Sequence, residues 1–221
     1  MGCCLFGIAL LVYFLLNLYG VLSPSSSFFT AVISKGNKER EVYLTFDDGP
    51  TENSAKILDW LKENRITAVF FLIGNQAKQQ PLIVQRMIDE GHIVGAHTMT
   101  HRWDFPLRRP DNIATEIMKG VEVIPCTVEW FRPPFGVINP LVALGVKRTN
   151  LKIMTWSLRT FDGVTFDKYK IIQRLKKVKG KDIILFHDTN DDIISLLDRF
   201  NEIIDQKELT FGHPSSIGDS I

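Results

Sequence analysis

The sequence has few cysteines and no excess of either charge, and both absences narrow its function. Only three of the 221 residues are cysteine, and because Cys3 and Cys4 adjoin the N-terminus, Cys126 stands alone in the body of the chain. A lone cysteine excludes a disulfide framework inside the domain. The 26 basic and 25 acidic residues leave a formal net charge of +1, so no global field attracts nucleic acid or an anionic surface. We therefore expect no nucleic-acid partner, and a neutral substrate fits this balance.

Charged residues are also missing from the N-terminal segment, which is an almost unbroken apolar run over residues 5–22. A bilayer is spanned by about 20 apolar residues, so we predict that residues 1–22 form a membrane anchor or signal-anchor, with a cleaved signal peptide as the alternative. Lys35, Lys38 and Arg40 all follow this run. The positive-inside tendency would keep the domain in the cytoplasm, although long domains can translocate regardless of such charges. These residues leave the orientation open.

The rest of the chain divides into a polar linker (23–37), a folded domain (38–215) and a tail (216–221). In the domain, apolar runs typical of buried strands alternate with segments whose apolar residues recur at helical spacing. Such alternation predicts an α/β fold of parallel strands joined by crossover helices, because short turns cannot join parallel neighbours. A barrel and an open doubly wound sheet both satisfy it. The expected strands are 42–44, 68–73, 93–95, 153–156 and 183–186, with one more leading into Phe131; the expected helices are 54–64, one from Pro81, 113–124, 141–144, 169–178 and 193–204.

Two adjacent carboxylates, Asp47 and Asp48, follow the first expected strand at the point where Gly49 and Pro50 end it. In α/β folds, side chains at the carboxyl ends of the strands build the active site. The alternative is a surface turn, since Asp-Gly and Gly-Pro are ordinary turn sequences. The other segments of the chain have to decide between these interpretations.

Three histidines strengthen the first interpretation. His97 and His101 follow the strand at 93–95, and their spacing predicts two imidazoles on one side of a helical turn. Two imidazoles and one carboxylate, from Asp47 or Asp48, make a three-ligand zinc site that leaves a position open for water. His187 ends another apolar strand, and parallel strands would bring all these groups to one rim. The alternatives are two surface histidines, and a hydrogen-bonded His187 without chemistry.

Arg132 and Asp162 are two further candidates at expected strand ends. Arg132 precedes the rigid Pro133-Pro134 pair, where a guanidinium can clamp a carboxylate bidentately. Asp162 follows the strand that ends at Trp156 and could hold and polarise an imidazole such as His187. A surface arginine before a proline turn, and a turn aspartate before glycine, are the alternatives.

Four short motifs follow one another along the chain: Thr-Phe-Asp-Asp-Gly-Pro (45–50), His-Thr-Met-Thr-His (97–101), Arg-Pro-Pro-Phe-Gly (132–136) and Leu-Phe-His (185–187). Together, in this order, they resemble the motifs of the polysaccharide deacetylases, which are carbohydrate esterase family 4 or the NodB-homology domain. The resemblance extends over about residues 41–211. It implies a distorted (β/α) barrel of about seven strands, fewer than the eight of a complete barrel, and a metal-dependent hydrolysis of N-acetyl groups on amino-sugar polymers.

The resemblance also assigns roles position by position. Asp47 matches the general base and His187 the general acid. Arg132 matches the residue that orients the base, and Asp162 is kept as the partner of the acid. The implied metal ligands are Asp48, His97 and His101, and the implied substrate-binding residues are Pro133, Phe135 (through its backbone N–H), Leu185 (the wall of the acetyl pocket) and Trp156.

The chain departs from the family pattern between Trp156 and Gly163. The family commonly has an aspartate there and then Asp-Trp, whereas this chain has Arg159 at the first position, Asp162 at the second and Gly163 in place of the tryptophan. We therefore expect an aromatic wall of the sugar groove to be missing. The segment from His101 to Arg132 is also shorter than usual. Trp103 and Phe105 in it could stack on a sugar, but core packing is their expected role.

These observations together predict a membrane-anchored, monomeric polysaccharide N-deacetylase whose substrate is an acetylated glycan. One divalent metal ion is expected, zinc by preference, with cobalt or nickel as alternatives. The domain is expected outside the cytoplasm, where the family's polymer substrates usually lie, despite the charges that follow the apolar run. The alternatives are an O-acetyl polysaccharide esterase and a non-catalytic carbohydrate-binding homologue.

Overall fold

The computed structural model describes residues 19–21, 23–165 and 167–217. Strands and helices alternate along these residues, and every pairing between named strands is parallel. The strands follow the order β1-β6-β5-β4-β3-β2-β8-β7 across the sheet, with β9 paired to β2. The strands are β1 Val32–Ile33, β2 Glu41–Gly49, β3 Val69–Leu72, β4 Ile93–Ala96, β5 Trp130–Phe131, β6 Lys152–Met154, β7 Leu158–Arg159, β8 Ile183–His187 and β9 Thr210–Phe211.

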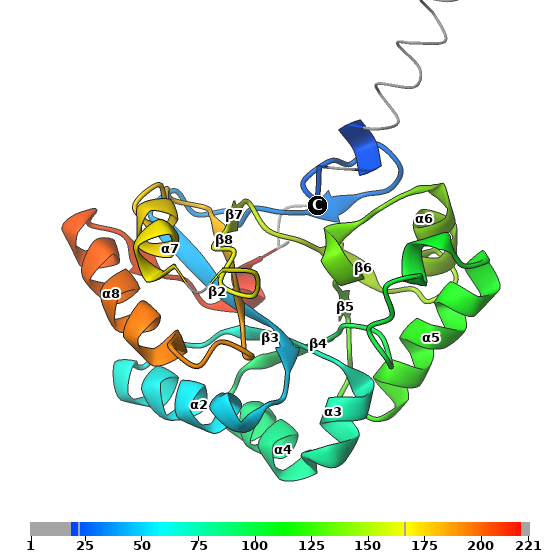
Figure 1. The fold of residues 1–221 in the computed structure, drawn as a ribbon, viewed down its shortest axis with the longest axis horizontal. Helices are drawn as coiled ribbons and strands as arrows, with labels where there is room; N and C mark the ends of the chain where they lie inside the picture. Colours follow the sequence, from blue (N-terminus) through cyan, green and yellow to red (C-terminus); the bar gives the residue numbers. More distant parts are fainter. Residues whose placement is uncertain (1–18, 22, 166, 218–221) are drawn as a thin grey trace, which may run out of the picture.

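The helices cover the outside of this sheet (Figure 1). Each buries one apolar stripe, as α8 does with residues three and four apart, including Leu196, Phe200 and Ile203. The helix α2 begins at a capping box in which Thr51 and Ser54 satisfy each other's backbone N–H groups. The helices are α2 Glu52–Asn64, α3 Gly74–Gln79, α4 Pro81–Asp89, α5 Pro110–Glu122, α6 Pro140–Val146, α7 Lys168–Leu175 and α8 Ile193–Gln206, with short 3₁₀ turns at Phe105–Leu107, Pro134–Gly136 and Pro214–Ser216.

The two faces of the sheet have different contents because successive residues of a strand point to opposite sides. In β2, Val42 and Phe46 belong to the large apolar cluster that packs with the helices. Tyr43 belongs to a smaller cluster on the other face. Thr45 and Asp47 share the face of Tyr43 by the same alternation, so the polar end of this strand points away from the helices.

The neighbouring strand β8 follows the same rule. Phe186 joins the cluster under the helices, and Leu185 joins the smaller cluster. The parallel register pairs Thr45 with Leu185 and Asp47 with His187. The carboxyl ends of β2 and β8 therefore place the Asp47 carboxylate and the His187 imidazole side by side.

The architecture is a parallel-strand half-barrel with helices outside, as expected for a distorted (β/α) barrel. The edge strands in the pairing order, β1 and β7, are not paired with each other, so the barrel stays open. The described residues contain nine strands, where about seven were expected. The additional strands include β1 and β9, each of two residues, which are too short to show a periodic pattern.

The predicted linker, membrane anchor and tail can each be compared with the described residues. Within the predicted linker (23–37), Val32 and Ile33 form β1 and pair with β6, so this part of the segment belongs to the sheet. None of the helices among the described residues combines the length and the apolar character needed to cross a bilayer. The predicted anchor at 1–22 lies outside the described residues except for 19–21, and the predicted tail lies outside them beyond residue 217.

Candidate active site

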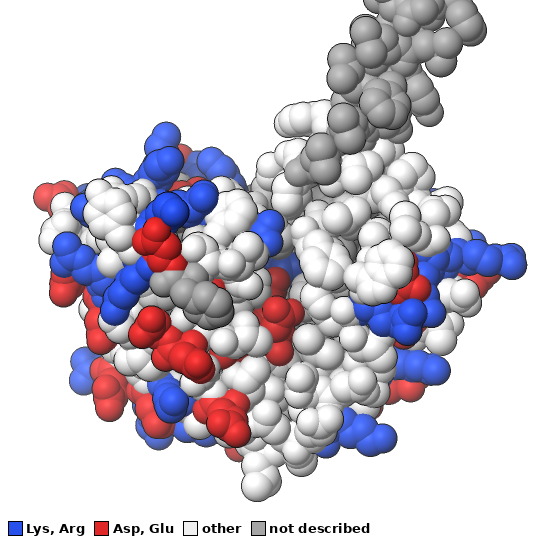
Figure 2. All heavy atoms as spheres, viewed as in Figure 1, with Lys and Arg blue, Asp and Glu red and all other residues white. Residues whose placement is uncertain are grey.

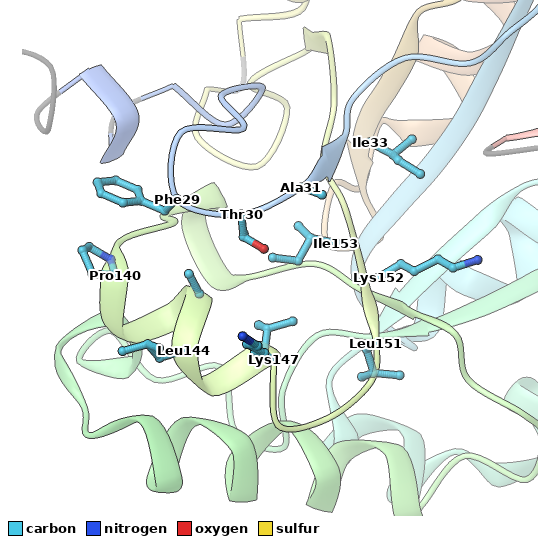
Figure 3. Close-up of a pocket in the computed structure, with 12 residues that line it drawn as sticks. Phe29, Thr30, Ala31, Ile33, Pro140, Leu144, Lys147, Leu151, Lys152 and Ile153 are labelled. Carbon is cyan, nitrogen blue, oxygen red and sulfur yellow. The ribbon is translucent and has the colours of Figure 1, made fainter. Parts of the chain in front are cut away.

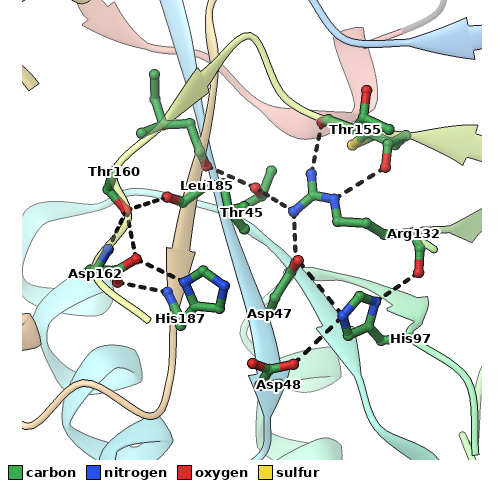
Figure 4. A network of polar contacts seen from close by, with 12 residues as sticks. Thr45, Asp47, Asp48, His97, Arg132, Thr155, Thr160, Asp162, Leu185 and His187 are labelled. Atoms are coloured by element: carbon green, nitrogen blue, oxygen red, sulfur yellow. Dashed lines mark hydrogen bonds and ion pairs between the residues drawn. The ribbon is translucent and has the colours of Figure 1, made fainter. Parts of the chain in front are cut away.

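Most of the predicted site residues line one pocket of about 140 Å³ at the carboxyl ends of the central strands. The chain brings them together from β2, β8 and the segments that follow β4, β5 and β6 (Figure 4). Three predicted residues do not line it: Arg132 and Asp162 lie behind it, bonded to residues that do, and Pro133 is buried. The predicted lining residues are Asp47, Asp48, His97, His101, Phe135, Trp156, Leu185 and His187.

Asp47 and Asp48 both reach the pocket although a regular strand would send them to opposite faces. The pairing of β2 with β3 shifts register between Asp47 and Gly49, which is a bulge at the strand end. Asp48 itself has φ 70°, in the left-handed region that aspartate tolerates better than most residues. The irregular strand end is therefore the reason that two adjacent carboxylates share one site.

Asp48, His97 and His101 form the group that could hold a metal ion. Their ligand atoms all lie within 4.8 Å of one another, and Asp48 Oδ1 lies 3.5 Å from the Nε2 atom of each histidine. The same Oδ1 is buried and has no hydrogen-bond partner within the described part of the chain. A buried carboxylate oxygen without a partner is costly unless a cation is present, so two imidazoles and this oxygen fit a divalent ion with open coordination positions.

His97 is held in the form that a metal ligand needs. Its Nδ1–H donates to the backbone oxygen of Arg132 at 2.7 Å, which leaves Nε2 free to face Asp48. Burial lowers the pKa of His97 to about 3, against the opposing attraction of Asp48. The imidazole is therefore neutral at physiological pH.

The segment from His97 to His101 is not the helical turn that the spacing suggested. Thr98 and His101 both have positive φ, at 68° and 49°, and the Thr98 hydroxyl accepts a hydrogen bond from the His101 backbone N–H at 2.9 Å. This local bond competes with helix formation. The two imidazole rings still meet, with centroids 4.7 Å apart.

Arg132 binds Asp47, but through one nitrogen only, so the bidentate clamp predicted from the sequence was wrong. Its Nη1 donates to Asp47 Oδ1 at 2.7 Å and to Thr45 Oγ1 at 2.8 Å. The Nε and Nη2 groups donate instead to the backbone oxygens of Met154 and Thr155. The side chain is fully buried, and since every nitrogen has a partner, the guanidinium fixes the Asp47 carboxylate in one orientation.

Asp162 and His187 form the second ion pair of the site. Asp162 Oδ1 accepts from His187 Nδ1, and its Oδ2 accepts from the His187 backbone N–H, each at 2.8 Å. Burial by itself would lower the pKa of His187, but the hydrogen bond and charge of Asp162 outweigh it and raise the pKa above the ordinary histidine value. Protonation of His187 is thus favoured, and its Nε2, which takes no part in these bonds, can face a ligand.

The rest of the wall is aromatic and apolar. Phe135 takes a left-handed φ of 60° in the turn after Pro134, and its ring lies 4.9 Å from that of His101. Trp156 and Leu185 are both buried beside the pocket. Trp103, which was expected in the core, is 75% exposed, so that expectation was wrong.

Sequence reasoning did not single out three residues that support or line the site. Thr45 and Thr160 hold the two ion pairs: Thr160 Oγ1 lies 2.5 Å from Asp162 Oδ1. For Thr45 a signal existed, since it lies two residues before Asp47 and so on the same face. Val164 lines the pocket, and nothing in the sequence around it indicated this position.

A larger cavity, of about 750 Å³, lies elsewhere (Figure 3). It is formed between the segment before β1, which includes Phe29, and the α6–β6 region, which includes Leu144 and Ile153. Among the residues that the structure describes, its ionisable lining groups are Lys147 and Lys152. No carboxylate or imidazole of the described residues lines it for acid–base chemistry or metal binding, so the smaller pocket is the candidate active site.

Comparison with known proteins identifies the family of the chain. Residues 34–154, more than half of the chain, match the family model described as polysaccharide deacetylase. The chain belongs to the polysaccharide deacetylase family. The matched range includes Asp47, Asp48, His97, His101 and Arg132, whereas Asp162 and His187 lie beyond it.

The chain is similar to two curated relatives and one solved structure that are named as carbohydrate deacetylases. It is similar to the peptidoglycan-N-acetylmuramic acid deacetylase PdaA of Bacillus subtilis (34% identity, 73% of this chain and 65% of the relative). It is also similar to chitin deacetylase 2 of Saccharomyces cerevisiae (32% identity, 76% of this chain and 57% of the relative). The chain thus spans about two thirds or less of each relative. The structure of the Bc1960 peptidoglycan N-acetylglucosamine deacetylase superposes with a TM-score of 0.74 at 31% identity, covering 86% of this chain and 93% of that one.

Proposed function

We propose that this polysaccharide deacetylase family member hydrolyses N-acetyl groups from an N-acetylglucosamine-containing polysaccharide, such as peptidoglycan or a chitin-like oligomer. One observation carries the proposal: three side chains that could hold a metal ion, a carboxylate held by a buried arginine and an imidazole held by a buried aspartate all line one pocket. Hydrolysis of an amide needs these three parts, namely an activated water, a base and an acid. The names of the relatives support an acetylated glycan as the substrate.

Asp48, His97 and His101 would hold one divalent ion, with zinc as the favoured metal and cobalt or nickel as alternatives. Such an ion polarises a carbonyl and lowers the pKa of water to about 7. Two imidazole nitrogens and one carboxylate are a donor set that suits zinc. The identity of the metal is tested by elemental analysis of the purified chain.

Asp47 would act as the general base that takes the proton of the attacking water. Its Oδ1 is occupied by Arg132, so Oδ2 is the oxygen left to accept that proton. Arg132 would act through Asp47, as a positioning residue.

His187 would act as the general acid that protonates the leaving amine. An amine departs poorly without a proton, and the Asp162 pair raises the pKa of His187 as this role requires. The Phe135 backbone N–H would donate to the developing oxyanion. The methyl of the acetyl group would lie against Leu185 and Trp156.

The test is acetate release by the full chain from peptidoglycan and from N-acetylglucosamine oligomers. Asp47→Asn and His187→Ala are each expected to lower kcat by about 10²–10⁴-fold, the usual contribution of a general acid or base, with the metal content unchanged. Release of acetate only from O-acetylated glycans would favour the esterase alternative. Binding of a glycan without release of acetate from any substrate would favour the non-catalytic one.

The proposed location of the enzyme is outside the cytoplasm, where such polymers lie. We expect the apolar run at 1–22 to anchor a monomeric domain there. Protease accessibility of the domain in intact cells tests this. Full protection behind a sealed membrane would contradict it.

Figure 2 shows Lys and Arg interspersed with Asp and Glu over one face, without a broad patch of either sign.

A further inference from the structure

Arg159 places an unpaired positive charge in the wall of the candidate active site. It ends β7 and pairs in register with Leu185 of β8, and both residues line the pocket. Its Nε is buried, and none of the described residues forms a hydrogen bond with it. Among the residues that the structure describes, no carboxylate forms an ion pair with its guanidinium and no group forms a hydrogen bond with it. A cation in this position is costly to maintain unless a ligand or function uses it.

The contacts that Arg159 does make hold its position without neutralising its charge. The guanidinium lies 4.6 Å from the ring centroid of Phe161 and 5.6 Å from that of Trp156. Arg174 approaches the same Phe161 ring at 4.1 Å. Aromatic faces attract a guanidinium, but they leave its N–H donors available. Burial lowers the pKa of Arg159, against the attraction of Asp47 and Asp162.

The proposed chemistry does not itself need this second guanidinium. The negative charge of Asp47 already has Arg132 as a partner at 2.7 Å, and that of Asp162 has His187 at 2.8 Å. Arg132 uses every nitrogen in bonds to the protein. This contrast indicates that the donors of Arg132 serve contacts within the fold, whereas the donors of Arg159 can bind a group of the substrate.

We propose that Arg159 binds a carboxylate carried by the acetylated sugar. This inference rests on the proposed deacetylation at the same pocket. The pocket measures only about 140 Å³, so a group that reaches Arg159 while the acetyl group meets the metal ligands must be attached close to the acetamido carbon. N-acetylmuramic acid has this arrangement, with a lactyl ether on the neighbouring ring carbon that ends in a carboxylate.

A planar guanidinium is well matched to such a group because it can offer two parallel N–H donors to one carboxylate. The substrate class is therefore an acetamido sugar with an adjacent acidic substituent, in preference to a neutral N-acetylglucosamine oligomer. The net charge of +1, which favoured a neutral substrate, averages over the whole chain and says nothing about this one position.

The experiment compares two matched substrates, a peptide-free N-acetylmuramic acid-containing tetrasaccharide and the same compound with its carboxylates methyl-esterified. The zinc-loaded full chain is expected to prefer the acid in kcat/KM. Arg159→Gln is expected to lower the acid-to-ester ratio of kcat/KM at least tenfold, mainly through KM, since a charge-assisted hydrogen bond is lost. Arg159→Lys should keep part of the preference, because it keeps the charge but not the planar pair of donors.

Arg174→Gln is the matched control, since it removes an arginine from the same Phe161 ring but not from the pocket. It should leave the acid-to-ester ratio unchanged. Thermal melting checks that each variant is folded. Calorimetric binding of both compounds to chains that also carry Asp47→Asn gives a second readout, in which Arg159→Gln should weaken binding of the acid alone.

The outcomes separate this inference from the proposed function. Equal losses on acid and ester in Arg159→Gln, or no preference in the unaltered chain, would overturn the role of Arg159 while leaving deacetylation intact. Failure of the unaltered chain to release acetate from either compound, from peptidoglycan and from N-acetylglucosamine oligomers would overturn deacetylation. The calorimetric comparison would then still decide whether Arg159 recognises the carboxylate.

Discussion

The two sides of the candidate active site use the same residue types in opposite states. On the β2–β4 side, His97 is neutral, with a pKa of about 3, because burial dominates and its Nδ1–H meets only a backbone oxygen. On the β7–β8 side, the pKa of His187 is raised, because Asp162 accepts from its Nδ1 and outweighs burial. The partner of Nδ1, carbonyl in one case and carboxylate in the other, separates a metal ligand from an acid.

The same contrast extends to the carboxylates. Asp48 keeps one oxygen buried and unpartnered, which suits a cation. Asp162 has both oxygens bonded to His187 and to Thr160, which suits a permanent structural partner. Variants on the two sides of the site should therefore affect different properties, metal content on one side and pH dependence on the other, and to different extents.

The largest effect is expected from the metal side. Asp48→Asn removes the charge of the unpartnered carboxylate, so the chain should lose its divalent ion and its acetate release should fall by about 10⁴-fold or more, since the ion contributes several kcal/mol to catalysis. The measurement pairs elemental analysis with kinetics. His187→Ala serves as the control, because it should lose activity while keeping the ion.

A full complement of metal in Asp48→Asn, with activity near that of the unaltered chain, would contradict the assignment of this side. Loss of the ion in His187→Ala would contradict the division between the sides. Either result would require the metal and acid roles to be reassigned among the pocket residues.

The next effect is a shift in pH dependence caused by Asp162→Asn. A general acid must be protonated, so activity falls as pH rises through the pKa of His187. Because Asp162 raises that pKa, its neutralisation should move the alkaline limb of kcat/KM to lower pH and reduce the maximum by roughly tenfold, as for other residues that orient a catalytic group. An alkaline limb that stays in place would contradict the pairing.

Stability should report the same pair through its own pH dependence. His187 has a raised pKa in the folded chain, so the stabilisation by Asp162 is fully present below the ordinary histidine value of 6.5 and is lost as pH rises through the folded pKa. Urea unfolding should therefore show the widest gap between the unaltered chain and Asp162→Asn on the acidic side of 6.5.

The sequence predicted those site residues whose positions follow from the alternation of side chains in strands and from parallel strand pairing. Asp47 and His187 were expected at one rim because each ends an apolar run, and the register pairs them directly. What could not be derived are features without a repeat: the bulge that turns Asp48 inward, the positive φ of Thr98 and the two-residue strand β1. Such features depend on single backbone angles and on contacts between distant segments.

The direction of Arg132 shows the same limit at the level of one side chain. Its residue type indicated a carboxylate partner, which Asp47 is. Its other donors go to the backbone oxygens of Met154, the last residue of β6, and of Thr155, the residue that follows it. Those carbonyls become available only where the strand β6 ends, so no residue pattern could have excluded a bidentate clamp.

The smallest effect should come from Thr45, which helps to position Arg132 and, through it, Asp47. The Thr45 hydroxyl accepts from Arg132 Nη1 and donates to the Ile184 backbone oxygen, each at 2.8 Å. Thr45→Val keeps the shape of the side chain but removes both bonds, so we expect a loss of about 1–2 kcal/mol in stability and a roughly two- to tenfold fall in kcat with little change in KM.

Thr155→Val is the matched control for this last effect. Thr155 is also fully buried beside Arg132, but its hydroxyl has no hydrogen-bond partner, and only its backbone oxygen meets the guanidinium. Its replacement should therefore be neutral or stabilising. If both variants lower kcat alike, buried volume near Arg132 matters more than the hydroxyl of Thr45, and the orientation of Asp47 depends on packing instead of on this hydrogen bond.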